Sequence, residues 1–148
     1  MKPRIIFIVT SCILFSLAVA AQESCRFTIR DDRGAIVGRV DNKGAVRNTS
    51  GRLIGRIRDR KVRDGSGAVL GRVDQNGSVR NRSGALMGRV EGDGKLRGAG
   101  GALIGRISPD GGVRNRSGAL RGRIEGFSSA CQHVAAAYLF FFEPFHKR

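Results

Sequence analysis

Regularly spaced arginines are the residues of this chain best suited to binding chemistry. Two series of six arginines recur along the sequence, one directly after a glycine and one directly after an aliphatic residue. A guanidinium group binds phosphates and carboxylates through paired, charge-assisted hydrogen bonds. The pattern therefore predicts anion-binding residues in both series: Arg39, Arg56, Arg72, Arg89, Arg106 and Arg123 in the first, and Arg30, Arg47, Arg63, Arg80, Arg97 and Arg114 in the second.

Catalytic and metal-binding chemistry has little support in the sequence. Cys131 and His133 stand two residues apart, and side chains at that spacing diverge on a helix. His133 and His146 have no carboxylate cluster beside them, as a metal site would need. No paired acids and no nucleophile with its base can be recognised. We therefore expect a non-enzymatic protein with no metal and no cofactor.

Two cysteines flank the repetitive part of the chain, Cys25 just before it and Cys131 just after it. In a closed structure these positions come close together, and an exported protein meets an oxidising environment that favours disulfides. The sequence does not supply the geometry that a disulfide requires. A Cys25–Cys131 disulfide and two unpaired thiols therefore both stay open.

The arginines belong to one short repeat that is used six times. The units begin at Gly34, Gly51, Gly67, Gly84, Gly101 and Gly118, so the period is 17 residues with one step of 16. Each unit contains Gly-Arg-Val or Gly-Arg-Ile, a turn, an aliphatic-Arg pair and a second turn. Turns such as Asn76-Gly77 suit hairpins, and the short stretches between turns have the length of strands. The repeat thus predicts about twelve short strands.

Alternation along these strands predicts which side chains face the core. In the longer strands the inward sets are Leu53-Gly55-Ile57, Val69-Gly71-Val73, Leu86-Gly88-Val90 and Leu103-Gly105-Ile107. In the shorter strands they are Ile29, Val46, Val62, Val79, Leu96 and Val113. The arginines face outward, and they share that face with Val37, Ile54, Leu70, Met87 and Ile104.

A sheet of about twelve strands is expected to close, because an open sheet would leave unpaired edges. A barrel of that size has a lumen that needs filling, and glycine at the middle inward position widens it. The apolar segment from His133 to Phe142 is available to fill it. We therefore predict an all-β, closed, pseudo-symmetric barrel built from 17-residue hairpin repeats, with an apolar, helical C-terminal segment that plugs the lumen.

The first residues are typical of a secretion signal. Lys2 and Arg4 precede an apolar stretch that ends in the small residues Ala18-Val19-Ala20. Lipidation at Cys12 fits less well, because the apolar run before it is short. We expect a signal peptide at 1–21, the repeat barrel at 22–126, and the plug with a basic tail at 127–148. The protein is then exported, either periplasmic or secreted, and it is strongly basic, with a net charge of +15 for the whole chain.

The tandem Gly-Arg units, their Asp-Gly and Asn-Gly turns and the closing stretch Ala135–Phe142 (AAAYLFFF) resemble the bacterial five-fold beta-flower proteins. The resemblance covers about Phe27 to Phe142. It implies a shallow all-β barrel, similar in outline to the Tubby C-terminal barrel with its central hydrophobic helix, and it brings no activity and no catalytic residues. The chain departs from five-fold counting because it holds six Gly-Arg units, and Arg58-Asp59-Arg60-Lys61 replaces one glycine turn.

Two functions from different classes stay open on the sequence. In the first, the arginines hold anionic lipid headgroups or a polyanionic polymer at the cell envelope. In the second, the protein is a structural or oligomeric scaffold whose partner is a second copy or another envelope protein. A third interpretation gives the arginines no partner and only a solubilising role. Nucleic acid is disfavoured, because the repeats after Phe27 lack aromatic residues for base stacking.

Overall fold

The computed structural model describes residues 24–143, so the predicted signal peptide lies outside the described residues. Twelve strands, a short 3-10 helix and one α-helix make up this part of the chain. Their bounds are β1 Phe27–Asp31, β2 Ile36–Val40, β3 Ala45–Arg47, β4 Leu53–Arg58, β5 Lys61–Asp64, β6 Val69–Val73, β7 Ser78–Asn81, β8 Leu86–Val90, β9 Lys95–Gly98, β10 Leu103–Ile107, β11 Gly112–Asn115, β12 Leu120–Glu125, η1 Ser129–Cys131 and α1 Gln132–Phe141.

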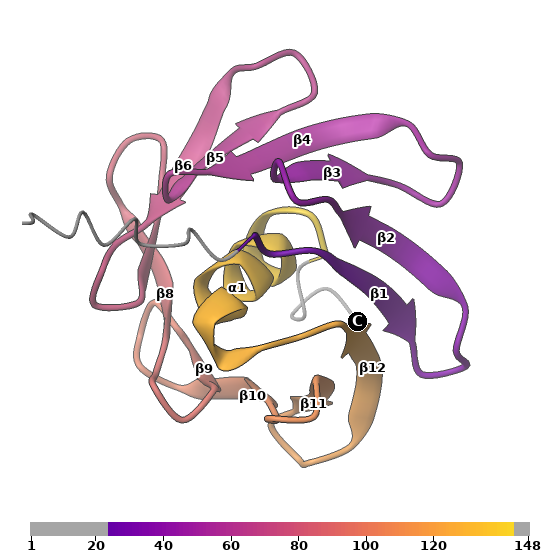
Figure 1. Ribbon diagram of the computed structural model, residues 1–148. Coiled ribbons are helices and arrows are strands. Elements are labelled where there is room, and N and C mark those ends of the chain that lie inside the picture. Colours follow the sequence, from indigo (N-terminus) through magenta and orange to yellow (C-terminus); the bar gives the residue numbers. More distant parts are fainter. Residues whose placement is uncertain (1–23, 144–148) are drawn as a thin grey trace, which may run out of the picture.

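The twelve strands close into one antiparallel barrel (Figure 1). Each strand pairs with its neighbours in sequence, and β1 completes the circle by pairing with β12, where Ile29 stands opposite Ile124. Closure leaves none of these twelve strands with an unpaired edge, which explains how such short strands can be stable. The predicted all-β barrel is confirmed. Its twelve described strands correspond to six repeats of two strands, one long and one short, and these are the six strand pairs of the barrel.

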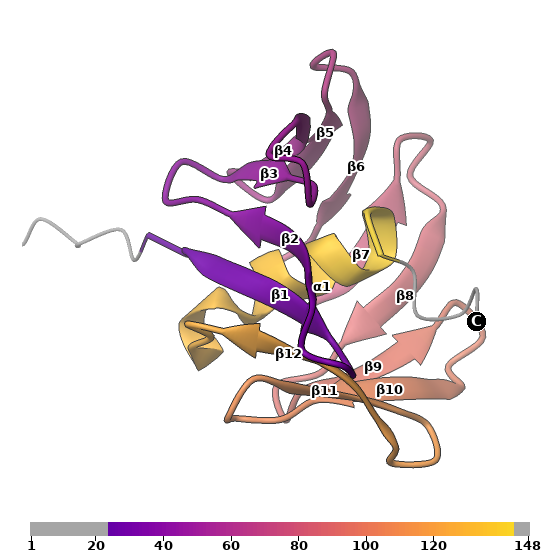
Figure 2. The same ribbon diagram turned by 90° about the vertical axis from the view of Figure 1, so that its right-hand side faces the viewer.

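Helix α1 lies inside the barrel, as Figures 1 and 2 show from two directions. Seven consecutive residues from Val134 to Phe140 are buried, so the barrel encloses the helix on every side. An isolated helix of 10 residues is barely stable in water, so contacts with β4, β6 and β8 stabilise it. The predicted plug is thus confirmed. No helix between residues 24 and 143 has the length and apolar character needed to cross a membrane.

The core consists of aliphatic side chains from the strands packed around the plug. The six inward residues predicted for the shorter strands are at most 3% exposed, which confirms their assignment. In four of the six longer strands the inward glycine makes room for an aromatic ring of the C-terminal segment, whereas Gly105 and Gly122 lie against the backbone of the neighbouring strand. The four contacts are Gly38 with Tyr138, Gly55 with Phe142, Gly71 with Phe141, and Gly88 with Phe140. A larger residue at these glycines would displace the plug.

A β-bulge near the start of each long strand changes the predicted faces. In β10 the register shifts between Leu103 and Gly105, so Ile104 is the extra residue. Leu103 therefore stands opposite Arg97 and is 38% exposed, whereas Ile104 packs against the core. The same shift occurs in the other five long strands.

The bulges make two parts of the face assignment wrong. The first residue of each predicted inward set stands opposite an outward arginine instead (Leu53, Val69, Leu86, Leu103). The residues predicted to share the arginine face pack against the core instead (Val37, Ile54, Leu70, Met87, Ile104). Alternation is restored after the bulge, so the later inward residues are buried as predicted (Ile57, Val73, Val90, Ile107).

Candidate anion-binding surface

Strand register brings the twelve predicted arginines together in pairs on the outside of the barrel. Each arginine that follows a glycine stands directly opposite one that follows an aliphatic residue. The pairs are Arg30–Arg123, Arg39–Arg47, Arg56–Arg63, Arg72–Arg80, Arg89–Arg97 and Arg106–Arg114. Directly opposite residues have Cβ atoms only about 5 Å apart, and like charges there destabilise a sheet. The two series therefore form one belt of six like-charged pairs, which we call the arginine belt.

One arginine of every pair is held by the turn that follows its strand. Nη1 of Arg80 donates a hydrogen bond to the carbonyl oxygen of Gly84 at 3.0 Å. The equivalent bonds join Arg30 to Gly34, Arg47 to Gly51, Arg63 to Gly67, Arg97 to Gly101 and Arg114 to Gly118. Half of the belt thus stabilises turns as well as carrying charge. Sequence reasoning missed this role, although an arginine four residues before each turn glycine is its signal.

Carboxylates neutralise part of the arginine belt. Asp74 lies between Arg72 and Arg80, and each of its two oxygens accepts a hydrogen bond from one Nε at 2.9 Å. The hydrogen bonds from Arg72 and Arg80 hold the pKa of the Asp74 carboxyl below its ordinary value of 3.8. Further close ion pairs are Arg97–Glu91 and Arg30–Glu125, both at 2.7 Å.

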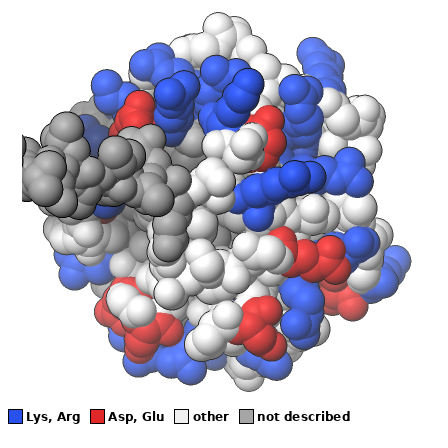
Figure 3. Space-filling view, in the orientation of Figure 1, with Lys and Arg blue, Asp and Glu red and all other residues white. Residues whose placement is uncertain are grey.

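Compensation of charge is uneven around the barrel. The pairs Arg39–Arg47 and Arg56–Arg63, on strands β2 to β5, form no ion pair with a carboxylate of the described chain. Figure 3 shows the distribution of charged side chains from one end of the barrel. Basic side chains dominate the upper edge of the view, where acidic ones are few, and acidic side chains are more frequent over the lower half. An anion on the β2–β5 side would therefore meet guanidinium groups that no carboxylate occupies.

The outer face also carries apolar side chains, but not the ones that alternation predicts. The bulges place one aliphatic residue opposite the turn-bound arginine of each unit (Ile36, Leu53, Val69, Leu86, Leu103, Leu120). Four of these are the exposed large hydrophobic residues of the described chain, at 37–39% exposure (Val69, Leu86, Leu103, Leu120). The outer face therefore carries one aliphatic side chain beside each arginine pair.

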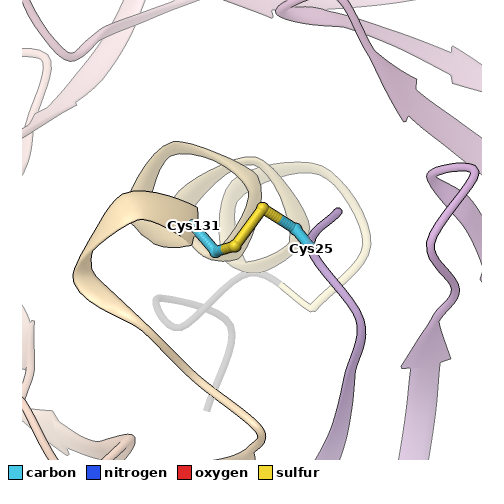
Figure 4. Close-up of a disulfide and its surroundings, with 2 residues drawn as sticks. All are labelled: Cys25 and Cys131. Atoms are coloured by element: carbon cyan, nitrogen blue, oxygen red, sulfur yellow. A yellow bond between two sulfur atoms is a disulfide. The ribbon is translucent and has the colours of Figure 1, made fainter. Parts of the chain in front are cut away.

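Cys25 and Cys131 form a disulfide (Figure 4). Their Cα atoms lie 5.5 Å apart, and the bond links the start of β1 to the start of α1. Of the two alternatives that the sequence left open, the structure contains the disulfide, so Cys131 carries no thiol that His133 could activate. Among residues 24–143, no three side chains of metal-binding types come together.

Comparison with known families agrees with this architecture. The sequence model of the 5-fold beta-flower protein family matches residues 26–142, which is most of the chain. The chain is a beta-flower protein. Its six described strand pairs exceed the five-fold count in the family's description, as the six Gly-Arg units of this beta-flower protein imply. No curated protein and no solved structure gives a significant match.

Proposed function

We propose that this beta-flower protein is a non-enzymatic binding protein that holds a polyanion on its arginine belt. The observation that carries the proposal is the direct cross-strand pairing of arginines in all six units. Opposite like charges cost stability, and an anionic group that bridges two guanidinium groups removes this cost. Each bridge would use one turn-bound arginine and one exposed arginine.

The shape of the belt favours a flexible polymer over a lipid surface. The arginine pairs encircle the barrel, because one lies at every second contact between neighbouring strands. A flat membrane touches a convex protein surface along only a small part of its circumference, whereas a flexible polymer can follow the whole arginine belt. The predicted signal peptide at 1–21 would place the protein where envelope polymers occur. A polymer with phosphate or carboxylate groups fits these features.

Binding of inorganic polyphosphate to the purified, oxidised protein tests this proposal. Fluorescence titrations between about 50 mM and about 200 mM salt are expected to show binding that weakens at least tenfold, because bound chains release counterions. Flotation with anionic and neutral liposomes runs in parallel. Absence of polyphosphate binding at low salt would overturn the proposal, and flotation with anionic vesicles in that case would assign the belt to lipid headgroups instead.

The exposed aliphatic residues Val69, Leu86, Leu103 and Leu120 favour a second candidate, a structural scaffold that assembles with itself or with another envelope protein. This function predicts that the apparent mass in solution rises with protein concentration. Sedimentation analysis of the wild type and of Leu86→Ser/Leu103→Ser measures this. If the protein sediments as a monomer at every concentration and binds polyphosphate, the scaffold function is contradicted and polyanion binding remains as the proposed function.

A further inference from the structure

The hairpin formed by β4 and β5 departs from the repeat in the sign of one charge. In four of the other five units, an acidic residue follows Gly-Arg-Val or Gly-Arg-Ile (Asp41, Asp74, Glu91, Glu125). Two of these acids bind the turn-bound arginine of the next strand, as Asp74 binds Arg80 and Glu91 binds Arg97. In the β4–β5 unit this position is Arg58, so a cation stands where a neutralising carboxylate is expected.

The turn of this hairpin is also built differently. The equivalent turns place a glycine with positive φ at their last position (Gly44, Gly77, Gly94, Gly111). Here Arg60 takes that place with φ 62°, after Asp59 with φ 50°, and these are the two non-glycine residues with positive φ in the described chain. The Arg60 carbonyl accepts a hydrogen bond from the Val73 N–H at 2.9 Å, as Gly77 accepts one from Val90. A left-handed arginine is conformationally costly, and such a cost often marks a functional segment.

The altered turn extends the hairpin by one outward pair of cations. Besides Arg56 opposite Arg63, this hairpin pairs Arg58 with Lys61. On its other side Lys61 stands opposite Arg72 of β6, so three cations follow one another across three strands. We call the outward residues Arg56, Arg58, Lys61 and Arg63 the basic hairpin face.

The basic hairpin face is almost free of carboxylates. Its single ion pair in the described chain joins Arg58 Nε to Asp59 at 3.9 Å, and these two side chains are 70% and 83% exposed. Such an exposed, long contact contributes little. The equivalent lysine of β9 shows the contrast, because Lys95 Nζ lies 3.0 Å from Asp93. The three exposed cations Arg56, Arg58 and Lys61 and the half-buried Arg63 therefore lie together here without a neutralising partner of comparable geometry.

We propose that the basic hairpin face is the principal docking site on the arginine belt for a linear polymer that carries phosphate groups. The inference rests on the proposed function and specifies where on the arginine belt the polymer binds. Consecutive phosphates would be held by the Arg56–Arg63 pair and by the Arg58–Lys61 pair, which are neighbours along the same two strands. Planar guanidinium groups bind phosphate oxygens in pairs, and Lys61 adds a compact charge. The other pairs of the belt bind more weakly where carboxylates occupy them.

Two double variants of equal charge test this site with inorganic polyphosphate as the probe. Arg56→Gln/Lys61→Gln removes two cations from the basic hairpin face. Arg89→Gln/Lys95→Gln removes the equivalent two residues from β8 and β9. We expect the first variant to weaken polyphosphate binding roughly tenfold and the second about twofold or less. Thermal unfolding followed by circular dichroism establishes that both variants are folded.

Equal weakening of polyphosphate binding in both variants would overturn the docking site. The proposed function would still stand, because all parts of the arginine belt would then contribute equally to binding. Failure of the wild type to bind would overturn the proposed function itself. Arg58→Asp provides an independent measurement, since it restores the carboxylate of the other units without touching Arg56 or Lys61. It is expected to weaken binding as well, and unchanged affinity in this folded variant would count against the site.

Discussion

Glycine and arginine stand side by side in every long strand, and they serve opposite faces of the barrel wall. At Gly88-Arg89 the glycine admits the ring of Phe140 to the lumen, while the arginine is exposed outside. Because neighbouring residues of a strand point to opposite faces, the Gly-Arg dipeptide of β2, β4, β6 and β8 supplies both the space for the plug and the charge of the belt. The repetition of Gly-Arg therefore reflects two separate constraints, one from packing and one from charge.

The packing constraint predicts a large effect of Gly88→Ala. A Cβ atom at Gly88 would lie 2.6 Å from Phe140 Cε1 and against the carbonyl oxygen of Arg97, so either the ring or the strand has to move. We expect a loss of about 1–3 kcal/mol in the free energy of unfolding, measured by urea titration. Gly100→Ala is the matched control, because a Cβ atom there meets nothing within 4 Å. Equal stability of the two variants would contradict the packing role of Gly88.

At the scale of elements, helix α1 depends on the barrel that surrounds it. It has no side-chain cap at its first turn and no acidic residue there, so its own sequence does little to stabilise it. His133 in this turn is half-buried, and the β4–β5 turn lies near enough for Arg60 to act on it. Burial first, and then the charge of Arg60, lower the pKa of His133 below its ordinary value of 6.5.

This lowered pKa predicts how stability depends on pH. Below pH 6.5 the unfolded chain binds a proton at His133 more readily than the folded protein does, so acidification favours unfolding. The contribution of neutral His133 to the free energy of unfolding is complete above pH 6.5 and is lost as the pH falls toward the pKa of His133 in the folded protein. We expect the midpoint of thermal unfolding to drop between about pH 7 and about pH 5, and to drop less in His133→Gln. The same decrease in both proteins would contradict this role of His133.

At the scale of the whole molecule, two links join the beginning of the described chain to its end. Hydrogen bonds between β1 and β12 close the sheet, and the Cys25–Cys131 disulfide links the start of the barrel to the start of the plug. The disulfide spans 106 residues, so it restricts most of the unfolded chain. Barrel and plug are thereby held as one unit, and the belt outside depends on both.

Removal of the disulfide is expected to lower stability without changing the fold. Cys25→Ser/Cys131→Ser should reduce the free energy of unfolding by about 2–5 kcal/mol, because the unfolded state regains the freedom of a long loop. Urea unfolding with and without a reducing agent measures the effect. The reducing agent should destabilise the wild type by a similar amount and leave the double variant unchanged. A double variant with the midpoint of the oxidised wild type would contradict this prediction.

Most of the architecture follows from local patterns in the sequence. The 17-residue period, the alternation around Val79 or Val113 and the turn glycines are properties of short segments, so they predict strands, closure and the outward arginines without knowledge of partners. The apolar segment from His133 to Phe142 predicts the plug in the same way. What local patterns do not contain is the register between strands. One extra residue in each long strand, such as Ile104 in β10, moved Leu103 outward and Ile104 toward the core. Register alone decided that Arg56 stands opposite Arg63.

The disulfide, the hydrogen bond from Arg80 to the Gly84 carbonyl and the uncompensated charge of the β4–β5 hairpin likewise depend on distances across the barrel. Those distances are set only when all twelve strands have closed around the plug.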